Sequence, residues 1–420
     1  MIRDCVQFTT RILLSFLILH SSHFALAQWT EQAPVLKDPD KLDNAFFGSS
    51  VAIDDSVAFV GVAGHPSGGQ FRGHVNVYRN NGAGWVKDQI LQASDQVDGA
   101  LFGASVAVNE NVAVIGALRH ASGGTQRGQA YVFRYNGKSW VEEQILSASD
   151  KVDGGLFGMS VALSGNTVIV GADGHGSGQG DGAERGHAYI FRHNSAKWTQ
   201  AQILQASDEE RAAHFGGSVA VDGNVAVVGA LHHRSGGGNR GQAYVFRYNG
   251  TNWEQEQILQ ASDKMNNAQF GSSVSVKGNV ALVGANQHLF GGKIRGQAYV
   301  YRRGGTAWKE EQILQASDAV NGASFGTSVA LDGGVAVIGS YSHPSGGKQR
   351  GEAYVFRNNG TSWTEEQILR ASDAVDGARF GSCVALQGNV ALISACDPAG
   401  GTQPGHAYIF SSSAHAASPK

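Results

Sequence analysis

The dipeptide Phe-Gly occurs seven times along this chain at almost constant spacing, and this repeat restricts the fold more than any other feature. Neighbouring copies lie 55 residues apart, except for one interval of 58. The seven tryptophans follow the same period, so every tryptophan belongs to the repeat. Such a period indicates an array of similar supersecondary units. The repeated residues are Phe47, Phe102, Phe157, Phe215, Phe270, Phe325 and Phe380, with Trp29, Trp85, Trp140, Trp198, Trp253, Trp308 and Trp363.

One unit contains the pattern of four short strands. In the fourth copy, the apolar runs and turn residues predict strands at 215–221, 225–230, 241–247 and 253–259. Tight turns join the first strand to the second and the third to the fourth, whereas a glycine-rich loop joins the second to the third. The second strand is almost wholly Val, Ala, Ile and Gly in every copy. This composition is typical of a strand buried on both faces.

A unit of this kind cannot cover its own apolar faces, so the copies must pack against one another. We therefore predict an all-β fold, a seven-bladed β-propeller of four-stranded antiparallel blades over residues 28–411. The last copy ends after its third strand at Phe410, while residues 29–36 form a fourth strand that no blade precedes. The N-terminal strand is therefore expected to complete the last blade, followed by a short polar tail at 412–420.

Residues 1–27 do not belong to the repeat. Arg3 and Arg11 precede an apolar run at 12–19, and Ala25-Leu26-Ala27 forms a small-residue cleavage pattern before Gln28. The pattern predicts a secretory signal peptide. A membrane anchor is the alternative, but the apolar run is shorter than the ~20 residues that span a bilayer. We expect a secreted protein, extracellular or at the cell surface, without membrane insertion.

The motifs F-G-x-S-V-A, V-G-A and G-x-A-Y-V-F resemble the FG-GAP repeat of integrin-α-type propellers. The additional W-x-x-E-Q-I-L-x-A-S-D resembles the variant common in bacterial extracellular proteins, and the resemblance covers nearly all of residues 29–410. It implies a propeller that binds protein ligands on the face carrying the loops between strands two and three (2–3 loops) and between strands four and one (4–1 loops). We call this the upper face.

The resemblance does not extend to calcium. Calcium-binding FG-GAP repeats have an Asp-rich loop between strands one and two, whereas this chain has short turns such as Asp222-Gly223-Asn224 and Ser164-Gly165-Asn166. These turns offer too few oxygen atoms for the six to eight ligands that calcium takes. No cofactor is therefore expected.

One position of the 2–3 loop is histidine in six copies, and Asp397 lies near the corresponding place in the last. The histidines predict either a ligand-binding ring or imidazoles that anchor their own loops. A shared metal is disfavoured because adjacent blades lie about 10 Å apart, whereas zinc binds nitrogen at about 2 Å. Only the neighbours His232 and His233 can share an ion. The six histidines are His65, His120, His175, His233, His288 and His343.

Arginine precedes the third strand in six copies, with Pro404 in the last, and aspartate closes each fourth strand. One interpretation is a polar ring that recognises a ligand. The favoured interpretation is an arginine–carboxylate pair that links blades, with the aspartate also capping its own turn. The residues are Arg72, Arg127, Arg185, Arg240, Arg295 and Arg350, and Asp40, Asp95, Asp150, Asp208, Asp263, Asp318 and Asp373.

The third copy is irregular, because its loop at 173–184 has three extra residues. Asp173, Asp181 and Glu184 lie among its glycines and form a candidate calcium or ligand site. The alternative is a harmless insertion, which surface loops tolerate readily.

Without the signal peptide, the chain has two cysteines, Cys383 and Cys396, both in the last copy. An oxidising compartment would permit a disulfide between the first two strands of that blade. Their mismatch in a simple hairpin register favours two small buried thiols instead.

The sequence has no G-x-S-x-G or H-E-x-x-H motif, and its formal net charge of −3 gives no general attraction for nucleic acid. The leading hypothesis is a non-enzymatic binding or adhesion module that presents the upper loops to an extracellular protein or glycan. The alternatives are an extracellular propeller enzyme acting on polysaccharide and a purely structural cell-surface spacer.

Overall fold

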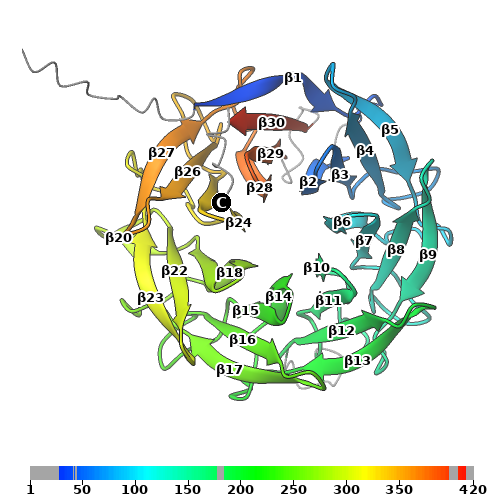
Figure 1. The fold of residues 1–420 in the computed structure, drawn as a ribbon, viewed down its shortest axis with the longest axis horizontal. Helices are drawn as coiled ribbons and strands as arrows, with labels where there is room; N and C mark the ends of the chain where they lie inside the picture. Colours follow the sequence, from blue (N-terminus) through cyan, green and yellow to red (C-terminus); the bar gives the residue numbers. More distant parts are fainter. Residues whose placement is uncertain (1–27, 41, 43–44, 177–183, 397–404, 413–420) are drawn as a thin grey trace, which may run out of the picture.

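The computed structural model describes residues 28–40, 42, 45–176, 184–396 and 405–412. The predicted signal peptide lies outside these ranges. Seven four-stranded antiparallel sheets stand around a central axis and form a closed ring (Figure 1). The predicted all-β, seven-bladed propeller is therefore confirmed. Among the described residues, no helix is long and apolar enough to cross a membrane.

The blades are numbered in chain order, and each consists of four strands that are hydrogen-bonded to their neighbours. Blade 1 contains β2 (Phe47–Asp54), β3 (Val57–Val62), β4 (His74–Asn80) and β5 (Trp85–Leu91). Blade 2 contains β6 (Phe102–Asn109), β7 (Val112–Ala117), β8 (Gln129–Tyr135) and β9 (Trp140–Leu146). Blade 3 contains β10 (Ser160–Ser164), β11 (Thr167–Ala172), β12 (His187–His193) and β13 (Trp198–Leu204). Blade 4 contains β14 (Phe215–Asp222), β15 (Val225–Ala230), β16 (Gln242–Tyr248) and β17 (Trp253–Leu259).

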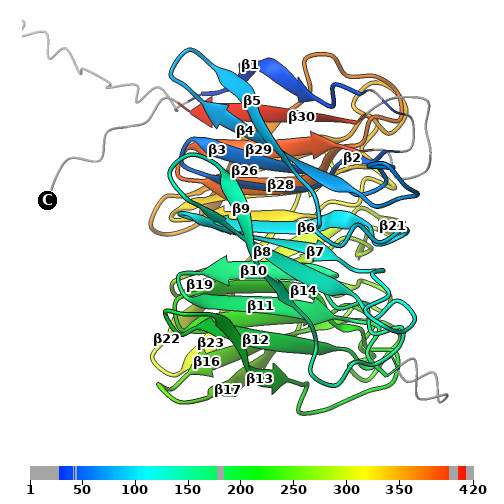
Figure 2. The same cartoon turned by 90° about the vertical axis from the view of Figure 1, so that its right-hand side faces the viewer.

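Blade 5 contains β18 (Phe270–Lys277), β19 (Val280–Ala285), β22 (Gln297–Gly304) and β23 (Ala307–Leu314), and its 2–3 loop adds a small hairpin of β20 (Leu289–Phe290) and β21 (Lys293–Ile294). Blade 6 contains β24 (Val329–Asp332), β25 (Val335–Ser340), β26 (Glu352–Asn358) and β27 (Trp363–Leu369). Blade 7 contains β28 (Phe380–Gln387), β29 (Val390–Ala395), β30 (His406–Ser412) and the N-terminal strand β1 (Trp29–Lys37). In the side view of Figure 2, the upper face is on the right, where β21 lies.

The N-terminal strand closes the ring as predicted. Strand β1 pairs antiparallel with β30, and Trp29 lies opposite Ser412. The last blade therefore takes three strands from the C-terminal end and one from the N-terminal end, which explains why the repeat begins out of phase.

The hydrophobic core lies between neighbouring blades. One buried cluster combines Phe59 and Leu91 of blade 1 with Phe102 and Trp140 of blade 2. The rings of Phe59 and Trp140 meet edge to face, with centroids 5.0 Å apart. Since each blade contributes to two such clusters, no blade buries its apolar faces alone.

Glycine in V-G-A permits a close approach between blades. A Cβ atom at Gly116 would lie 2.1 Å from the carbonyl oxygen of Gly158, which belongs to the Phe-Gly pair of the next blade. The same oxygen accepts a hydrogen bond of 2.8 Å from the Ser105 hydroxyl. The F-G-x-S and V-G-A motifs therefore form one inter-blade contact.

The tryptophan motif forms a second inter-blade contact on the outer strands. The Gln89 side chain donates to the carbonyl oxygen of Trp140 and accepts from its backbone N–H, both at 2.8 Å. Glu142 accepts hydrogen bonds from the backbone and hydroxyl of Ser94 in the loop after β5. The constant spacing of these residues thus repeats the contact at every joint from blade 1 to blade 7 along the chain.

Candidate functional site

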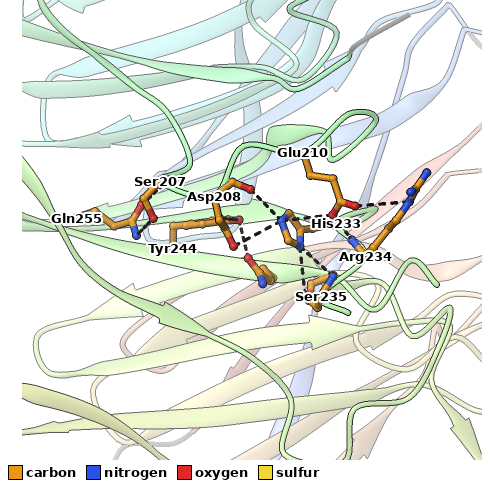
Figure 3. Close-up of polar contacts among 10 residues, drawn as sticks. Ser207, Asp208, Glu210, His233, Arg234, Ser235, Tyr244 and Gln255 are labelled. Atoms are coloured by element: carbon orange, nitrogen blue, oxygen red, sulfur yellow. Dashed lines mark hydrogen bonds and ion pairs between the residues drawn. The ribbon is translucent and has the colours of Figure 1, made fainter. Parts of the chain in front are cut away.

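Each recurring histidine is a loop-anchoring residue, and His233 of blade 4 illustrates the arrangement (Figure 3). The backbone N–H of Ser235 donates to His233 Nδ1 at 3.1 Å, so the ring proton of the neutral imidazole lies on Nε2. That nitrogen faces the carboxylates of Asp208 at 3.5 Å and Glu210 at 3.4 Å. The contact ties the 2–3 loop to the preceding 4–1 loop. The equivalent pairs are His65–Asp40 (3.1 Å), His120–Asp95 (3.1 Å), His175–Asp150 (3.1 Å), His288–Asp263 (2.8 Å) and His343–Asp318 (3.8 Å).

The same aspartate accepts a hydrogen bond from a buried tyrosine of the third strand. In blade 4, the Tyr244 hydroxyl lies 2.7 Å from Asp208 Oδ1 (Figure 3), and burial raises the pKa of Tyr244 far above its usual value. Six of the seven aspartates that close a fourth strand therefore point inward, whereas Asp40 has no such contact because the corresponding residue of β4 is Asn76. Sequence reasoning missed the tyrosine, although it is the Tyr of G-x-A-Y-V-F. The other pairs are Tyr131–Asp95, Tyr189–Asp150, Tyr299–Asp263, Tyr354–Asp318 and Tyr408–Asp373.

Three arginines form the expected pair with a carboxylate, but the partner is not the aspartate that closes the fourth strand. Four arginines bind a side chain in the following 4–1 loop, three residues beyond the aspartate that closes the fourth strand. The aspartate that closes the fourth strand already contacts histidine and tyrosine, so it is not the partner of the arginine. The pairs are Arg72–Asp98 (2.6 Å), Arg127–Asp153 (2.5 Å), Arg240–Asn266 (2.8 Å) and Arg350–Asp376 (2.8 Å).

The other two arginines have different surroundings. Arg185 lies 4.0 Å from Glu209, and the Arg295 guanidinium lies over the Phe290 ring at 5.4 Å from its centroid. Asp397 and Pro404, which replace histidine and arginine in the last copy, lie outside the described residues. A 2–3 loop such as that of blade 4 is thus held on one side through its histidine and on the other through its arginine.

The irregular loop of blade 3 brings two of the three predicted metal ligands together. Asp173 and Glu184 face opposite nitrogen atoms of His214, at 3.5 Å and 3.3 Å respectively. Asp181 lies outside the described residues. The hydrogen bond that the Asp173 carboxylate accepts raises the pKa of His214, because it favours the charged form of the imidazole. The His214 ring thus lies between the two carboxylates of the predicted site that the structure describes.

The neighbours His232 and His233 point to different partners. The His232 ring packs edge to face on His214, with centroids 4.7 Å apart, and its Nε2 lies 3.3 Å from the Gln269 amide. His233 is bonded to Asp208, as described above. The two imidazoles therefore do not converge on a common ion.

The described residues contain two groups that could hold a metal ion. In each group, three donor atoms lie within 4.8 Å of one another. The first is Asp150, His175 and His187 in the loops of blade 3. The second is Asp318, His343 and Glu352 in blade 6, where Arg370 is bonded to Glu352 at 2.7 Å. Burial alone would raise the pKa of Glu352, but hydrogen bonds from His343, Tyr354 and Arg370 lower it to about 2. In the blade 6 group, the Arg370 guanidinium therefore already supplies a positive charge beside the carboxylate.

The two cysteines are thiols in the structure, with no bond between their sulfur atoms. Cys383 takes the place of the inter-blade serine, and its Sγ lies 3.3 Å from the carbonyl oxygen of Ser49. Burial raises the pKa of the Cys383 thiol to about 11, which makes it a poor nucleophile. Both side chains serve packing.

Two hollows between upper loops that the structure describes are small. One lies beside Ser235 and Arg240 and another beside Ser67 and Arg72, each with a volume of about 10 Å³. The central channel is larger, about 240 Å³, and aliphatic residues of the seven innermost strands line most of it, among them Val51, Val108 and Leu163. The upper face therefore presents loops rather than a deep pocket at these positions.

The comparison with protein families agrees with this geometry. A family model described as the FG-GAP repeat matches residues 85–133, 140–191, 198–246, 253–301, 308–356 and 363–410. The chain belongs to the FG-GAP repeat family. Each matched FG-GAP segment begins with the outer strand of one blade and ends in the third strand of the next, so the sequence repeat spans a joint between blades.

Among solved structures, the crystal structure of Sqt1 from Saccharomyces cerevisiae matches this FG-GAP propeller with a TM-score of 0.49 and 10% sequence identity. The match covers 87% of this chain and 83% of Sqt1. A search of curated proteins found no match. The FG-GAP propeller fold is consistent with a binding or adhesion module.

Proposed function

We propose that this FG-GAP propeller is a secreted, non-enzymatic binding module whose upper face holds an extracellular protein or glycan. The observation that carries the proposal is the bracing of the 2–3 loops from both sides. In blade 4, His233 binds Asp208 of the preceding loop and Arg240 binds Asn266 of the following one. A face whose loops are already ordered loses less conformational entropy when it binds a large partner.

The upper loops also carry exposed side chains of the kind that anchor interfaces. Phe71 in blade 1 is 51% exposed, and Phe290 in blade 5 is 43% exposed. Aromatic residues and arginine contribute a large share of binding energy at protein interfaces. These residues lie on different blades, so one ligand that contacts both must extend across the face.

At two positions between the upper loops, the small hollows favour a large ligand over a small substrate. A volume of about 10 Å³ holds about one water molecule, whereas pockets for small molecules are typically about 300–1,000 Å³. A partner of the upper loops is therefore recognised across their surface.

A binding array of extracellular proteins and glycans tests the proposal with purified residues 28–420. Once a ligand is found, Phe71→Ser and Phe290→Ser should each weaken binding by about tenfold or more, the effect of removing one interface anchor. Val141→Ser is the matched control, because Val141 is equally exposed but lies on the outer strand β9. Equal loss in the control variant, or turnover of an arrayed glycan, would contradict the proposal.

The pattern of residues 1–27 supports the secreted part of the proposal. Expression of the full chain in an export-competent host should release a protein that begins at Gln28. N-terminal sequencing of the released protein measures the cleavage site. Retention of the intact N-terminus on a membrane would instead favour an anchor.

A further inference from the structure

Three donor atoms converge at the upper edge of blade 3. Asp150 follows β9 in the 4–1 loop, His175 follows β11 in the 2–3 loop, and His187 is the first residue of β12. Asp150 Oδ2 lies 3.1 Å from His175 Nε2 and 3.7 Å from His187 Nδ1. All three donor atoms lie within 4.8 Å of one another. The set comes from three separate segments and from both sides of the joint between blades 2 and 3.

We propose that Asp150, His175 and His187 form a binding site for a divalent transition-metal ion of the zinc type. Zinc binds imidazole nitrogen and carboxylate oxygen at about 2.0–2.2 Å, so two ligands of a tetrahedral ion lie roughly 3.3 Å apart. The observed separations of 3.1 and 3.7 Å lie on either side of that value. Two nitrogen ligands and one oxygen ligand suit zinc rather than calcium or magnesium, which prefer oxygen.

The neighbouring groups orient these ligands. The Tyr189 hydroxyl donates to both carboxylate oxygens of Asp150, at 2.9 and 3.0 Å. The Gln205 amide lies 2.7 Å from His187 Nε2, and rotation of the amide lets its oxygen accept the proton on that nitrogen. Nδ1 of His187 is buried without a hydrogen-bond partner. Its lone pair is then available to the ion, and such supporting contacts strengthen metal binding.

Metal binding requires a small rearrangement of the two imidazoles. Their rings are stacked, with centroids 3.5 Å apart and an interplanar angle of 21°. A ligating imidazole holds its metal close to the ring plane. The angle between the two ring planes must therefore increase before both imidazoles can bind one ion. The Asp150 side chain is 29% exposed, which gives the ion a route from solvent.

Comparison with blades 1, 2, 4, 5 and 6 shows how this site differs from theirs. The position of His187 is glutamine in blades 2, 4 and 5, where Gln129, Gln242 and Gln297 each accept a hydrogen bond from the neighbouring tyrosine. In blade 6 the position is Glu352, and the Arg370 guanidinium already supplies the positive charge. In blade 1 it is His74, whose ring is near Ser67 and Asp38 rather than grouped with Asp40.

The test is a zinc titration of the purified mature chain after removal of metal with a chelator. Isothermal calorimetry should show one saturable site, and Co²⁺ in its place should give the visible absorption bands of a four-coordinate ion. His187→Gln should weaken zinc binding by about 100-fold or more, because loss of a ligand should cost at least as much as the roughly 10–100-fold lost with an outer-shell partner. This variant reproduces the residue of three sibling blades, so its melting temperature without metal should match that of the parent chain.

His193→Gln is the matched control, because His193 lies at the other end of β12 beside Glu143. It should bind zinc as tightly as the parent chain. Gln297→His should create a second site in blade 5, where Asp263 and His288 are already 2.8 Å apart, and raise the stoichiometry to two. Absence of a saturable site, or equal weakening by His187→Gln and His193→Gln, would overturn the proposal.

Discussion

Gln367 and Trp29 are separated by 338 residues yet exchange two hydrogen bonds. The backbone N–H of Trp29 donates to Gln367 Oε1 at 2.8 Å, and Gln367 Nε2 donates to the Trp29 carbonyl oxygen at 2.9 Å. The same exchange joins Gln89 to Trp140 and Gln312 to Trp363 at joints within the continuous chain. The N-terminal strand therefore enters the ring through the contact that also joins blades 1 to 6 to one another.

Replacing this tryptophan should weaken the whole ring. Trp29 is only 2% exposed and packs in the core between blades 6 and 7. Trp29→Ala is expected to lower the free energy of unfolding by about 3–5 kcal/mol, and deletion of residues 28–37 by more. Chemical denaturation measures the loss. Val86→Ala, on the exposed face of β5, is the control and should change little. An unchanged unfolding midpoint for Trp29→Ala would contradict closure by the N-terminal strand.

Removal of a recurring histidine should affect stability because the imidazole anchors its loop. His120 accepts from the backbone N–H of Ser122 and faces Asp95. His120→Ala leaves both groups without that partner and should cost about 1–3 kcal/mol. The exposed Arg234→Ala serves as the control in the same thermal melts. Normal stability combined with lost ligand binding would show instead that the imidazole contacts the ligand.

The sequence was sufficient to predict the blades and their closure. Periodicity alone located β15 at Val225–Ala230 and β17 at Trp253–Leu259, because strand patterns and turn residues are local signals. The N-terminal strand was predicted from the missing fourth strand of the last copy. Both inferences rest on the order of residues along the chain, which a repeat makes easy to compare.

Side-chain partners were harder to predict because they depend on distances between blades. Asp95 and Asp98 are three residues apart in one loop, yet Asp95 turns inward to Tyr131 and Asp98 outward to Arg72. Nothing in the spacing decides which carboxylate turns inward. The His175–His187 pair was also missed, although comparison of the copies shows that His187 replaces a glutamine.

The glycine of V-G-A should be intolerant of any side chain. A Cβ atom at Gly116 would lie 2.1 Å from the Gly158 carbonyl oxygen, a backbone atom of the next blade that cannot move aside cheaply. Gly116→Ala should therefore separate blades 2 and 3 and cost about 3 kcal/mol or more. Gly304→Ala is the control, since no atom lies within 4 Å of its Cβ position. Urea denaturation of the two variants compares them, and equal stability would contradict the close approach.

The carboxylate of Glu352 should make the ring sensitive to acid. The pKa of Glu352 is about 2 in the folded chain, against an ordinary value of 4.5, because hydrogen bonds from His343, Tyr354 and Arg370 outweigh the cost of burial. A carboxylate with a lowered folded pKa contributes stability above its unfolded pKa, and that stability is lost as the pH falls. The loss should therefore occur between pH 4.5 and pH 2.

Glu352→Gln tests this prediction, because glutamine occupies the position in blades 2, 4 and 5 and should fit the same space. At pH 7 the variant should be less stable than the parent chain by about 3 kcal/mol, the free energy linked to such a pKa difference. The difference should shrink steadily as the pH falls through the same range, since protonated Glu352 resembles glutamine. Denaturation midpoints at several pH values measure it, with the exposed Glu254→Gln as the control. A difference that stays constant from pH 7 to pH 2 would show that Glu352 contributes by packing alone, because only the ionised carboxylate binds Arg370 as an ion pair.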